Sequence, residues 1–284
     1  MTKIFETKEN IFENNVHISL RKMSGYDNII QFFAVWLDKK YLNAPFKNTV
    51  SIIDYYYQQI NIFKNELSNK KFFLSIEGGE ALENNLANLD KFYKLGVISL
   101  TLTWNHENNL AGGVNSECGL KKFGREVIDR MQELNMIIDI SHASKKTFWD
   151  IYKYSKSAFI ASHSNCRKIC DHPRNLDDDQ IIAIKERGGL IGLNSYKPFV
   201  NNKNKTDINH WLNHVDHLIN LIGTDNICLG CDFDGANDLI FTGMSDMKKP
   251  YDLLKISYGS DIADKIFYAN LKRFLDMRHY IKCH

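Results

Sequence analysis

The sequence predicts an α/β protein, a (β/α)8 barrel of the TIM type in which a standard first strand is missing. Short and nearly continuous apolar runs alternate with longer segments of helical periodicity along the chain. Such apolar runs indicate strands buried on both faces, and their alternation with helices indicates parallel pairing. The 284 residues fit one barrel of roughly 250 residues better than a doubly wound sheet. We therefore expect a single domain over residues 1–284.

Seven runs have the character of strands, and each is followed by a helix-like segment. The predicted strands are Asn28–Trp36, Phe72–Ile76, Ile98–Thr103, Ile137–Ser141, Ala158–Ser162, Gly189–Asn194 and Asn226–Cys231. Apolar positions recur at three and four in the helix-like segments, for example Gly119–Leu134, Asp177–Arg187 and Asp207–Ile222, and Lys40–Lys70 is expected to be mostly helical. A closed barrel needs eight strands. One strand is therefore hidden in the polar residues before Asn28, or it is absent.

Composition excludes several classes of protein. Lys and Arg number 36 and Asp and Glu number 34, a net charge of +2, so no electrostatic case exists for nucleic acid or an anionic membrane surface. Hydrophobic residues make up 44% and charged residues 25%, which argues against disorder. We expect no membrane span and no signal peptide. Six cysteines without regular spacing predict a reducing, cytoplasmic location.

Polar residues gather where the predicted strands end. Glu77, His106, His142, His163 and Asp232 all lie at or just after such ends. In a parallel barrel these ends meet at one mouth, where active sites of this fold lie. Imidazole and carboxylate groups together are ligands for Zn²⁺, and two ions in such a site activate water and polarise a carbonyl. The set predicts a metal site.

Other patterns are better explained by packing. Asp234 precedes a glycine and reads as a turn residue. His210, His214 and His217 share one side of an outer helix, and we interpret them as a packing or solvated face. Cys228 and Cys231 form a C-x-x-C, but in a strand the two side chains point to opposite faces, so we do not expect a redox or zinc site there.

Several stretches together resemble the membrane (renal) dipeptidase family of zinc metallopeptidases, and specifically its soluble bacterial members. The resemblance runs from about Gln31 to Phe274 and occurs in one order: QFFAVW, SIEGGEAL, LTLTWNHENNLAGG, IDISHAS, ASHSNCRKICDHPRNLDDDQI, LGCDFDG and IFYANLKRFL. It implies a (β/α)8 barrel with two zinc ions, and hydrolysis of dipeptides by a hydroxide that bridges the ions.

The resemblance also implies roles for individual residues. Glu77 corresponds to the carboxylate that bridges both ions, and His142 and His163 to the imidazole ligands of the second ion. Asp232 corresponds to the acid near the first ion that exchanges protons with the attacking water. Arg174 corresponds to the clamp for the terminal carboxylate of the substrate. His106 corresponds to a histidine that contacts the substrate, although some members carry that histidine directly after Leu-Thr, where this chain has Trp104.

One departure from the family concerns the first ion. The first strand of the family carries a His-x-Asp pair that binds this ion, and no His-x-Asp precedes Glu77 here. The nearest candidate is His17, but Ser19 stands where the aspartate is required, and the surrounding segment resembles one that follows the first strand. We therefore expect the chain to begin roughly 15 residues inside the family domain. We also expect at most one well-formed metal site, low or absent activity, and exposed strand edges that favour a homodimer.

Two alternatives stay open at this point. The first is a non-catalytic relative that binds a metal or a small ligand. The second is a different barrel metallohydrolase, such as a deaminase or an esterase. The segment that contains Arg174 favours a substrate with a carboxylate, and a small dipeptide substrate therefore remains the leading expectation.

Overall fold

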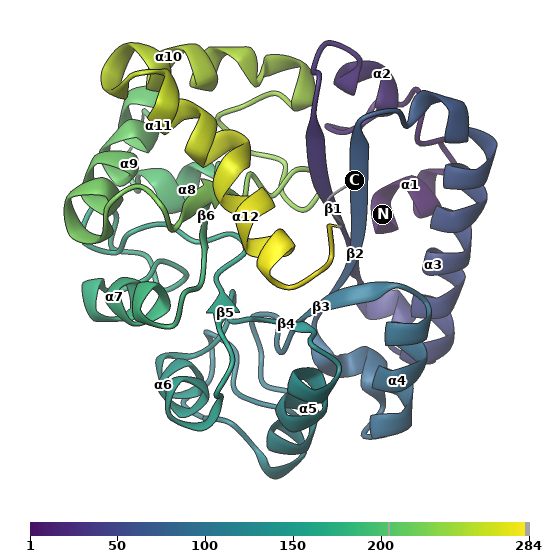
Figure 1. The fold of residues 1–284 in the computed structure, drawn as a ribbon. Coiled ribbons are helices and arrows are strands. Elements are labelled where there is room, and N and C mark those ends of the chain that lie inside the picture. Colours follow the sequence, from purple (N-terminus) through teal and green to yellow (C-terminus); the bar gives the residue numbers. More distant parts are fainter. Residues whose placement is uncertain (204, 282–284) are drawn as a thin grey trace. The chain divides into compact units, whose positions relative to one another are not determined.

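The computed structural model describes residues 1–203 and 205–281 and has the predicted α/β character, with parallel strands (Figure 1). The chain divides into two compact units, Met1–Ser157 and Ala158–His284. This division does not test the expectation of one domain over residues 1–284, which stays a prediction. Every one of the seven predicted strands is present and begins within two residues of its expected start, which confirms the interpretation of the apolar runs.

The first unit contains four strands that pair in chain order and in parallel. They are β1 (Ile29–Trp36), β2 (Lys70–Glu77), β3 (Val97–Thr101) and β4 (Ile137–Asp139). The register aligns their carboxyl ends: Trp36 lies opposite Glu77, Glu77 opposite Thr101, and Thr101 opposite Asp139. The register therefore brings the strand-end side chains of this unit to one edge of the sheet.

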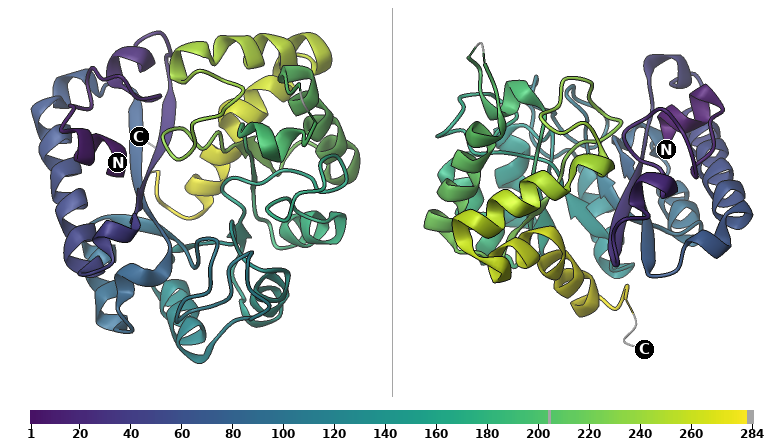
Figure 2. Two further views of the ribbon diagram at one scale, coloured as in Figure 1. Left: turned by 180° about the vertical axis from the view of Figure 1, so that it is seen from behind. Right: turned by 90° about the horizontal axis from the view of Figure 1, so that it is seen from above.

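Helices cover this sheet. They are α1 (Thr2–Thr7), α2 (Leu20–Met23), α3 (Pro45–Ile62), α4 (Leu86–Lys94), α5 (Lys122–Glu133) and α6 (Lys145–Tyr154), with short 3-10 helices at Lys39–Tyr41, Lys64–Glu66 and Gly79–Leu82. Figure 2 shows α1 and α3 side by side next to β1. Helix α3 begins with Pro45, whose missing N–H costs nothing in the first turn. Its Tyr56 ring packs 5.8 Å from the Phe33 ring of β1.

The residues before β1 form no strand. Residues 1–28 are all described, and they fold into α1, α2 and the loop between these helices, which contains His17. Of the two possibilities that the strand count left open, a strand hidden before Asn28 is therefore wrong. The helical expectation for Lys40–Lys70 is confirmed over the length of α3.

The second unit contains β5 (Phe159–Ile160), β6 (Ile191–Leu193) and β7 (Ile227–Leu229), with β6 and β7 parallel and Ala161 bridged in parallel to Ile191. Its helices are α7 (Asp178–Glu186), α8 (Lys197–Val200), α9 (Ile208–Ile222), α10 (Lys248–Tyr258), α11 (Ser260–Asp264) and α12 (Asn270–Met277), with a 3-10 helix at Met244–Asp246 and a π-helix at Lys265–Ala269. Asp177 and Asp207 begin α7 and α9 through capping boxes.

Two glycines let the strands of the second unit approach closely around Ser162. A Cβ atom on Gly192 would lie 1.9 Å from the Ser162 carbonyl oxygen, and one on Gly230 would lie 2.0 Å from the same atom. Any side chain at either position would displace the backbone directly before His163. At the other end of β7, the buried Asn270 side chain donates hydrogen bonds to the carbonyl oxygens of Thr224 and Ile227, which ties α12 to the strand.

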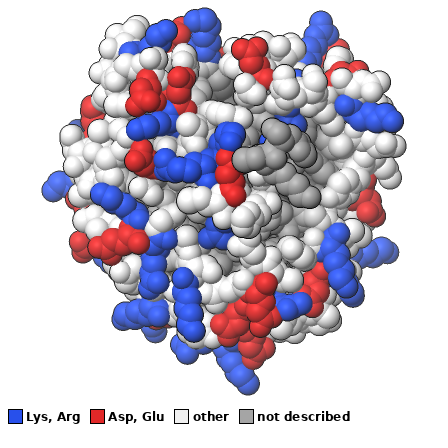
Figure 3. All heavy atoms as spheres, in the orientation of Figure 1, with Lys and Arg blue, Asp and Glu red and all other residues white. Residues whose placement is uncertain are grey.

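The surface agrees with the near-neutral charge balance. Basic and acidic side chains are interspersed over the face drawn in Figure 3. Within residues 1–203 and 205–281, none of the helices has both the length and the apolar character needed to cross a bilayer.

Gly230→Ala is expected to destabilise the protein, because its new methyl group meets backbone atoms rather than a side chain that can move. Overpacking of this kind costs about 1–3 kcal/mol, and backbone neighbours place the expected loss of unfolding free energy in the upper part of that range. Urea denaturation measures it. Gly25→Ala is the matched control, since its Cβ atom would meet no atom within 4 Å. Equal stability of the two variants would contradict the close packing.

Candidate metal centre

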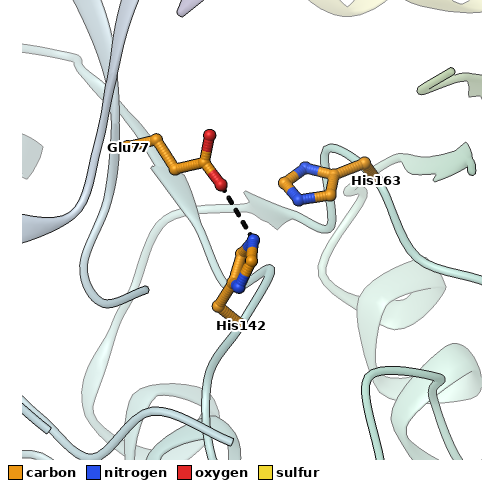
Figure 4. A group of neighbouring side chains, drawn as sticks. All are labelled: Glu77, His142 and His163. Carbon is orange, nitrogen blue, oxygen red and sulfur yellow. Dashed lines mark ion pairs between the residues drawn. The ribbon is translucent and has the colours of Figure 1, made fainter. Parts of the chain in front are cut away.

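Glu77 and His142 form a buried pair at the edge of the first sheet. Glu77 is the last residue of β2, and His142 follows β4. Nε2 of His142 lies 2.8 Å from Oε1 of Glu77, the contact dashed in Figure 4, and the two side chains are 7% and 16% exposed. A carboxylate and an imidazole in mutual contact and largely removed from water form part of a ligand set for a divalent ion.

The tautomer of His142 makes this pair a site for a cation. Its other ring nitrogen, Nδ1, lies 2.8 Å from the side-chain oxygen Oδ1 of Asn105. An amide oxygen only accepts hydrogen bonds, so Nδ1 carries the proton. Nε2 is then the ring nitrogen that faces the carboxylate. A ring nitrogen and a carboxylate oxygen 2.8 Å apart share either a proton or a metal ion, so the donor set fits a divalent metal ion.

The loop after β4 holds His142 in an uncommon backbone conformation. His142 has a φ of 68°, in the left-handed region. The buried Asp139 supports this turn, because one of its carboxylate oxygens accepts from the Ser141 amide and the other from the Thr101 hydroxyl at 2.6 Å. The acid of the Ile-Asp-Ile-Ser-His stretch therefore braces the loop and joins the ends of β3 and β4.

The two glycines after Glu77 form a turn that needs them. Gly78 has a φ of 98°, which side chains rarely adopt. A Cβ atom on Gly79 would lie 2.8 Å from the Leu102 carbonyl oxygen. The amides of both glycines donate to the segment after β3, Gly78 to Thr101 and Gly79 to Leu102. Glu77 is thereby held at a fixed height relative to β3.

His163 lies in the second unit, shortly after β5. Its side chain is buried, and Nδ1 lies 2.8 Å from the Ser162 hydroxyl oxygen. The Ser164 amide donates to the Gly192 carbonyl of β6, and this bond holds the backbone on the other side of His163. The sequence-predicted imidazole is therefore anchored at the carboxyl end of a parallel strand in its own unit.

Arg174 is buried in the loop that precedes α7. Its guanidinium carbon lies 5.4 Å from the centroid of the Phe199 ring, and its backbone N–H donates to Nδ1 of His172. Burial, followed by the charges of Arg174 and Arg167, lowers the pKa of His172. His172 is therefore neutral at neutral pH and adds no second positive charge beside the guanidinium.

Asp232 lies in a tight turn after β7. Asp232 and Asp234 both have left-handed backbones, with φ of 61° and 67°, and the amides of Gly235 and Ala236 donate to the Asp232 carbonyl oxygen. A Cβ atom on Gly235 would lie 2.2 Å from Oδ1 of Asp232. Asp234 is thus part of the predicted turn, and Gly235 leaves room for the half-buried Asp232 carboxylate.

The loop after β3 contains the residue that sequence reasoning missed. His106 is exposed, and its ring lies 6.4 Å from the Trp104 ring. Asn105, one residue earlier, contacts His142 instead. The signal was available in Thr-Trp-Asn-His, where Asn105 is the first side chain after Thr103 that carries a hydrogen-bond acceptor, just beyond a predicted strand end.

The histidines of α9 are packing residues with separate partners. His210 caps the helix with Asp207, and His217 contacts Asp178 on α7. His214 is fully buried; its Nδ1 accepts from the Cys166 amide, and its Nε2 lies 2.9 Å from the Val200 carbonyl oxygen. His214 and Asp216 match the His-x-Asp pattern of a metal-binding pair. Both ring nitrogens of His214, however, already contact backbone groups of Cys166 and Val200.

The cysteines of the C-x-x-C are buried free thiols, as are Cys166 and Cys170. Burial raises the pKa of Cys228 and of Cys231 to about 12. Both groups are therefore protonated at neutral pH, a poor state for binding zinc or attacking a disulfide. The expectation that they form no redox or zinc site stays a prediction.

Comparison with known proteins gives consistent matches. The family model described as membrane dipeptidase, peptidase family M19, matches residues 5–276. A protein of Klebsiella pneumoniae described as an uncharacterized protein in the pqqA 5′ region is 33% identical over 214 residues, which are 70% of this chain and 79% of that protein. An uncharacterized dipeptidase of Schizosaccharomyces pombe is 30% identical over 279 residues, 86% of this chain and 67% of its own length.

A solved structure shares the fold. It is that of a metallopeptidase from Rhodobacter sphaeroides liganded with a phosphinate mimic of the dipeptide L-Ala-D-Ala. The TM-score is 0.83 at 20% sequence identity, and the match covers 97% of this chain and 94% of that one. Dipeptidases of this kind have the TIM-barrel fold, so the comparison confirms the predicted fold class.

The buried His214 predicts a loss of stability in acid. Burial lowers its pKa to about 4, against roughly 6.5 in an unfolded chain. Between these two values the unfolded chain binds more protons than the folded one, so unfolding free energy falls as the pH is lowered from about 6.5 to 4, by on the order of 3 kcal/mol.

Urea denaturation at several pH values tests this expectation. His214→Gln removes the titrating group and is expected to flatten that part of the pH dependence. His210→Gln, at a half-buried position of the same helix, is the control and is expected to keep it. Equal pH dependence in the wild type and His214→Gln would show that His214 does not cause the acid loss.

Proposed function

Because the chain belongs to the membrane dipeptidase family, peptidase family M19, we propose that it binds a zinc ion through Glu77, His142 and His163 and hydrolyses dipeptides slowly. The observation that carries the proposal is the contact between Nε2 of His142 and the Glu77 carboxylate, two groups that can share a metal ion. His163 supplies a second anchored imidazole at a strand end. Two imidazoles and a carboxylate are a common zinc ligand set in hydrolases.

The remaining site residues act on the substrate. When bound, the ion polarises the scissile carbonyl and lowers the pKa of water. Arg174 offers a buried guanidinium for the free carboxylate of a dipeptide, and it suits a bidentate contact. Asp232 carries a proton to the departing amine, and His106 contacts the substrate from its exposed loop. These roles follow the family resemblance and belong to the proposal.

The proposal of slow turnover comes from the ligands of the first ion. No His-x-Asp precedes Glu77, and residues 1–28 form helices and a loop. One well-formed site is therefore proposed in this polypeptide. The same observation favours a second candidate function, a non-catalytic relative that binds a metal ion and a dipeptide without cleaving it.

Zinc titration by calorimetry is expected to give one site per chain. Glu77→Gln replaces a charged ligand by a neutral amide of the same shape, so we expect the zinc affinity to fall at least about tenfold, as ligand or supporting-residue losses do. His210→Gln is the control, since its half-buried ring lies on α9 beside Asp207. Two sites of equal affinity, or an unchanged affinity in Glu77→Gln, would contradict the proposed ligand set.

Arg174→Lys is expected to weaken hydrolysis of free dipeptides. A lysine keeps the charge but loses the planar fork, so kcat/KM should fall at least about tenfold, with little change for dipeptides whose carboxylate is blocked. Arg125→Lys, at an exposed helix position, is the control. Faster cleavage of blocked dipeptides or lactones than of free dipeptides would favour another hydrolase. Zinc and dipeptide binding without any cleavage would favour the non-catalytic candidate.

A further inference from the structure

We propose that Asn105 is a positioning residue that fixes the tautomer and the orientation of His142 for metal binding. The inference rests on the proposed function, since it assigns a role beside one of the proposed ligands. Neither the resemblance nor the matched proteins supply it. It comes from the contact between Oδ1 of Asn105 and Nδ1 of His142.

The chemistry of this contact is directional. The oxygen of Asn105 accepts, so it retains the proton on Nδ1 of His142 and leaves Nε2 as the lone-pair nitrogen. Nε2 is the atom 2.8 Å from the Glu77 carboxylate. Without the acceptor, the ring would be free to place its proton on Nε2 and donate it to Glu77, which would close the ligand pair with a hydrogen bond. Asn105 therefore keeps the pair open to a cation.

The Asn105 loop is fastened to the His142 loop through Gly113. A Cβ atom on Gly113 would lie 2.2 Å from the Trp104 carbonyl oxygen and 2.6 Å from the Asn105 carbonyl carbon, so the backbones touch. Gly113 also forms an antiparallel bridge with Ala143, the residue after His142. The Asn105 carbonyl oxygen accepts from the Asn115 amide at 2.8 Å. The acceptor is consequently held in place rather than being carried on a mobile loop.

The ring of Trp104, supported by Trp36, packs against the His142 imidazole and restrains it. The Trp104 ring lies 6.0 Å from the His142 ring at an angle of 35°, and the Trp36 ring packs 5.3 Å behind it. Trp104 thus restricts the tilt of the imidazole, while Asn105 fixes its rotation and its proton. A supporting acceptor on the second nitrogen of a metal-binding histidine is a general means of raising ligand strength.

Two substitutions separate the acceptor from the bulk of the side chain. Asn105→Leu keeps the size but removes the acceptor, and we expect its zinc affinity to fall about 10–100-fold by calorimetry. Asn105→Asp retains the acceptor and is expected to restore affinity to within a few-fold of wild type. Asn109→Leu, at an exposed position of the same loop, is the matched control and is expected to bind as wild type does. The visible spectrum of bound Co²⁺ provides a second readout of ligand geometry.

A direct measurement of the tautomer covers the case in which a variant fails to fold. In a long-range ¹H–¹⁵N spectrum of the metal-free wild-type protein, with the neutral ring assigned by His142→Gln, we expect the proton on Nδ1. A proton on Nε2 would overturn the inference. So would wild-type zinc affinity in Asn105→Leu, or equal loss in Asn105→Leu and Asn105→Asp. Wild-type protein that shows the Nδ1 tautomer but binds no zinc would instead contradict the proposed function and leave the positioning role supported.

Discussion

The parallel register of β1 to β4 is the constraint on which the candidate site depends. It sets Trp36, Glu77, Thr101 and Asp139 level with one another at the carboxyl edge of the first sheet. Glu77 can meet His142 only because β2 and β4 end at the same height on either side of β3. A shift of one residue in any of these strands would turn the strand-end side chain to the opposite face.

Around that edge, contacts within the loops orient the side chains of Glu77 and His142 toward each other. Asp139 braces the turn that carries His142, and Asn105 holds the imidazole proton away from Glu77. The contact between His142 and Glu77 holds either a proton or a metal ion. It explains why strained backbone at His142 and close glycine contacts at Gly79 and Gly113 gather in one small region.

The sequence predicted the seven strands, the main helices and the candidate ligands, because these depend on local periodicity and on residues at strand ends. It missed Asn105 and favoured His106, since neighbouring loop residues cannot be ranked without knowing which of them turns inward. Nor did the sequence indicate a role for Asp139. Only the hydrogen bonds from Thr101 and Ser141 show that this carboxylate is used to hold the loop.

By itself the sequence determined the order of strands and helices, the set of chemical groups available at the strand ends, and the family to which the motifs belong. Each follows from residues close together in the chain. The tertiary structure alone decided which nitrogen of His142 faces Glu77, and which loop supplies its support. Those outcomes depend on contacts between residues far apart in the chain, such as Asn105 and His142, which are separated by 37 positions. Local propensity does not specify atomic positions at that separation, whereas sheet register and close backbone packing do.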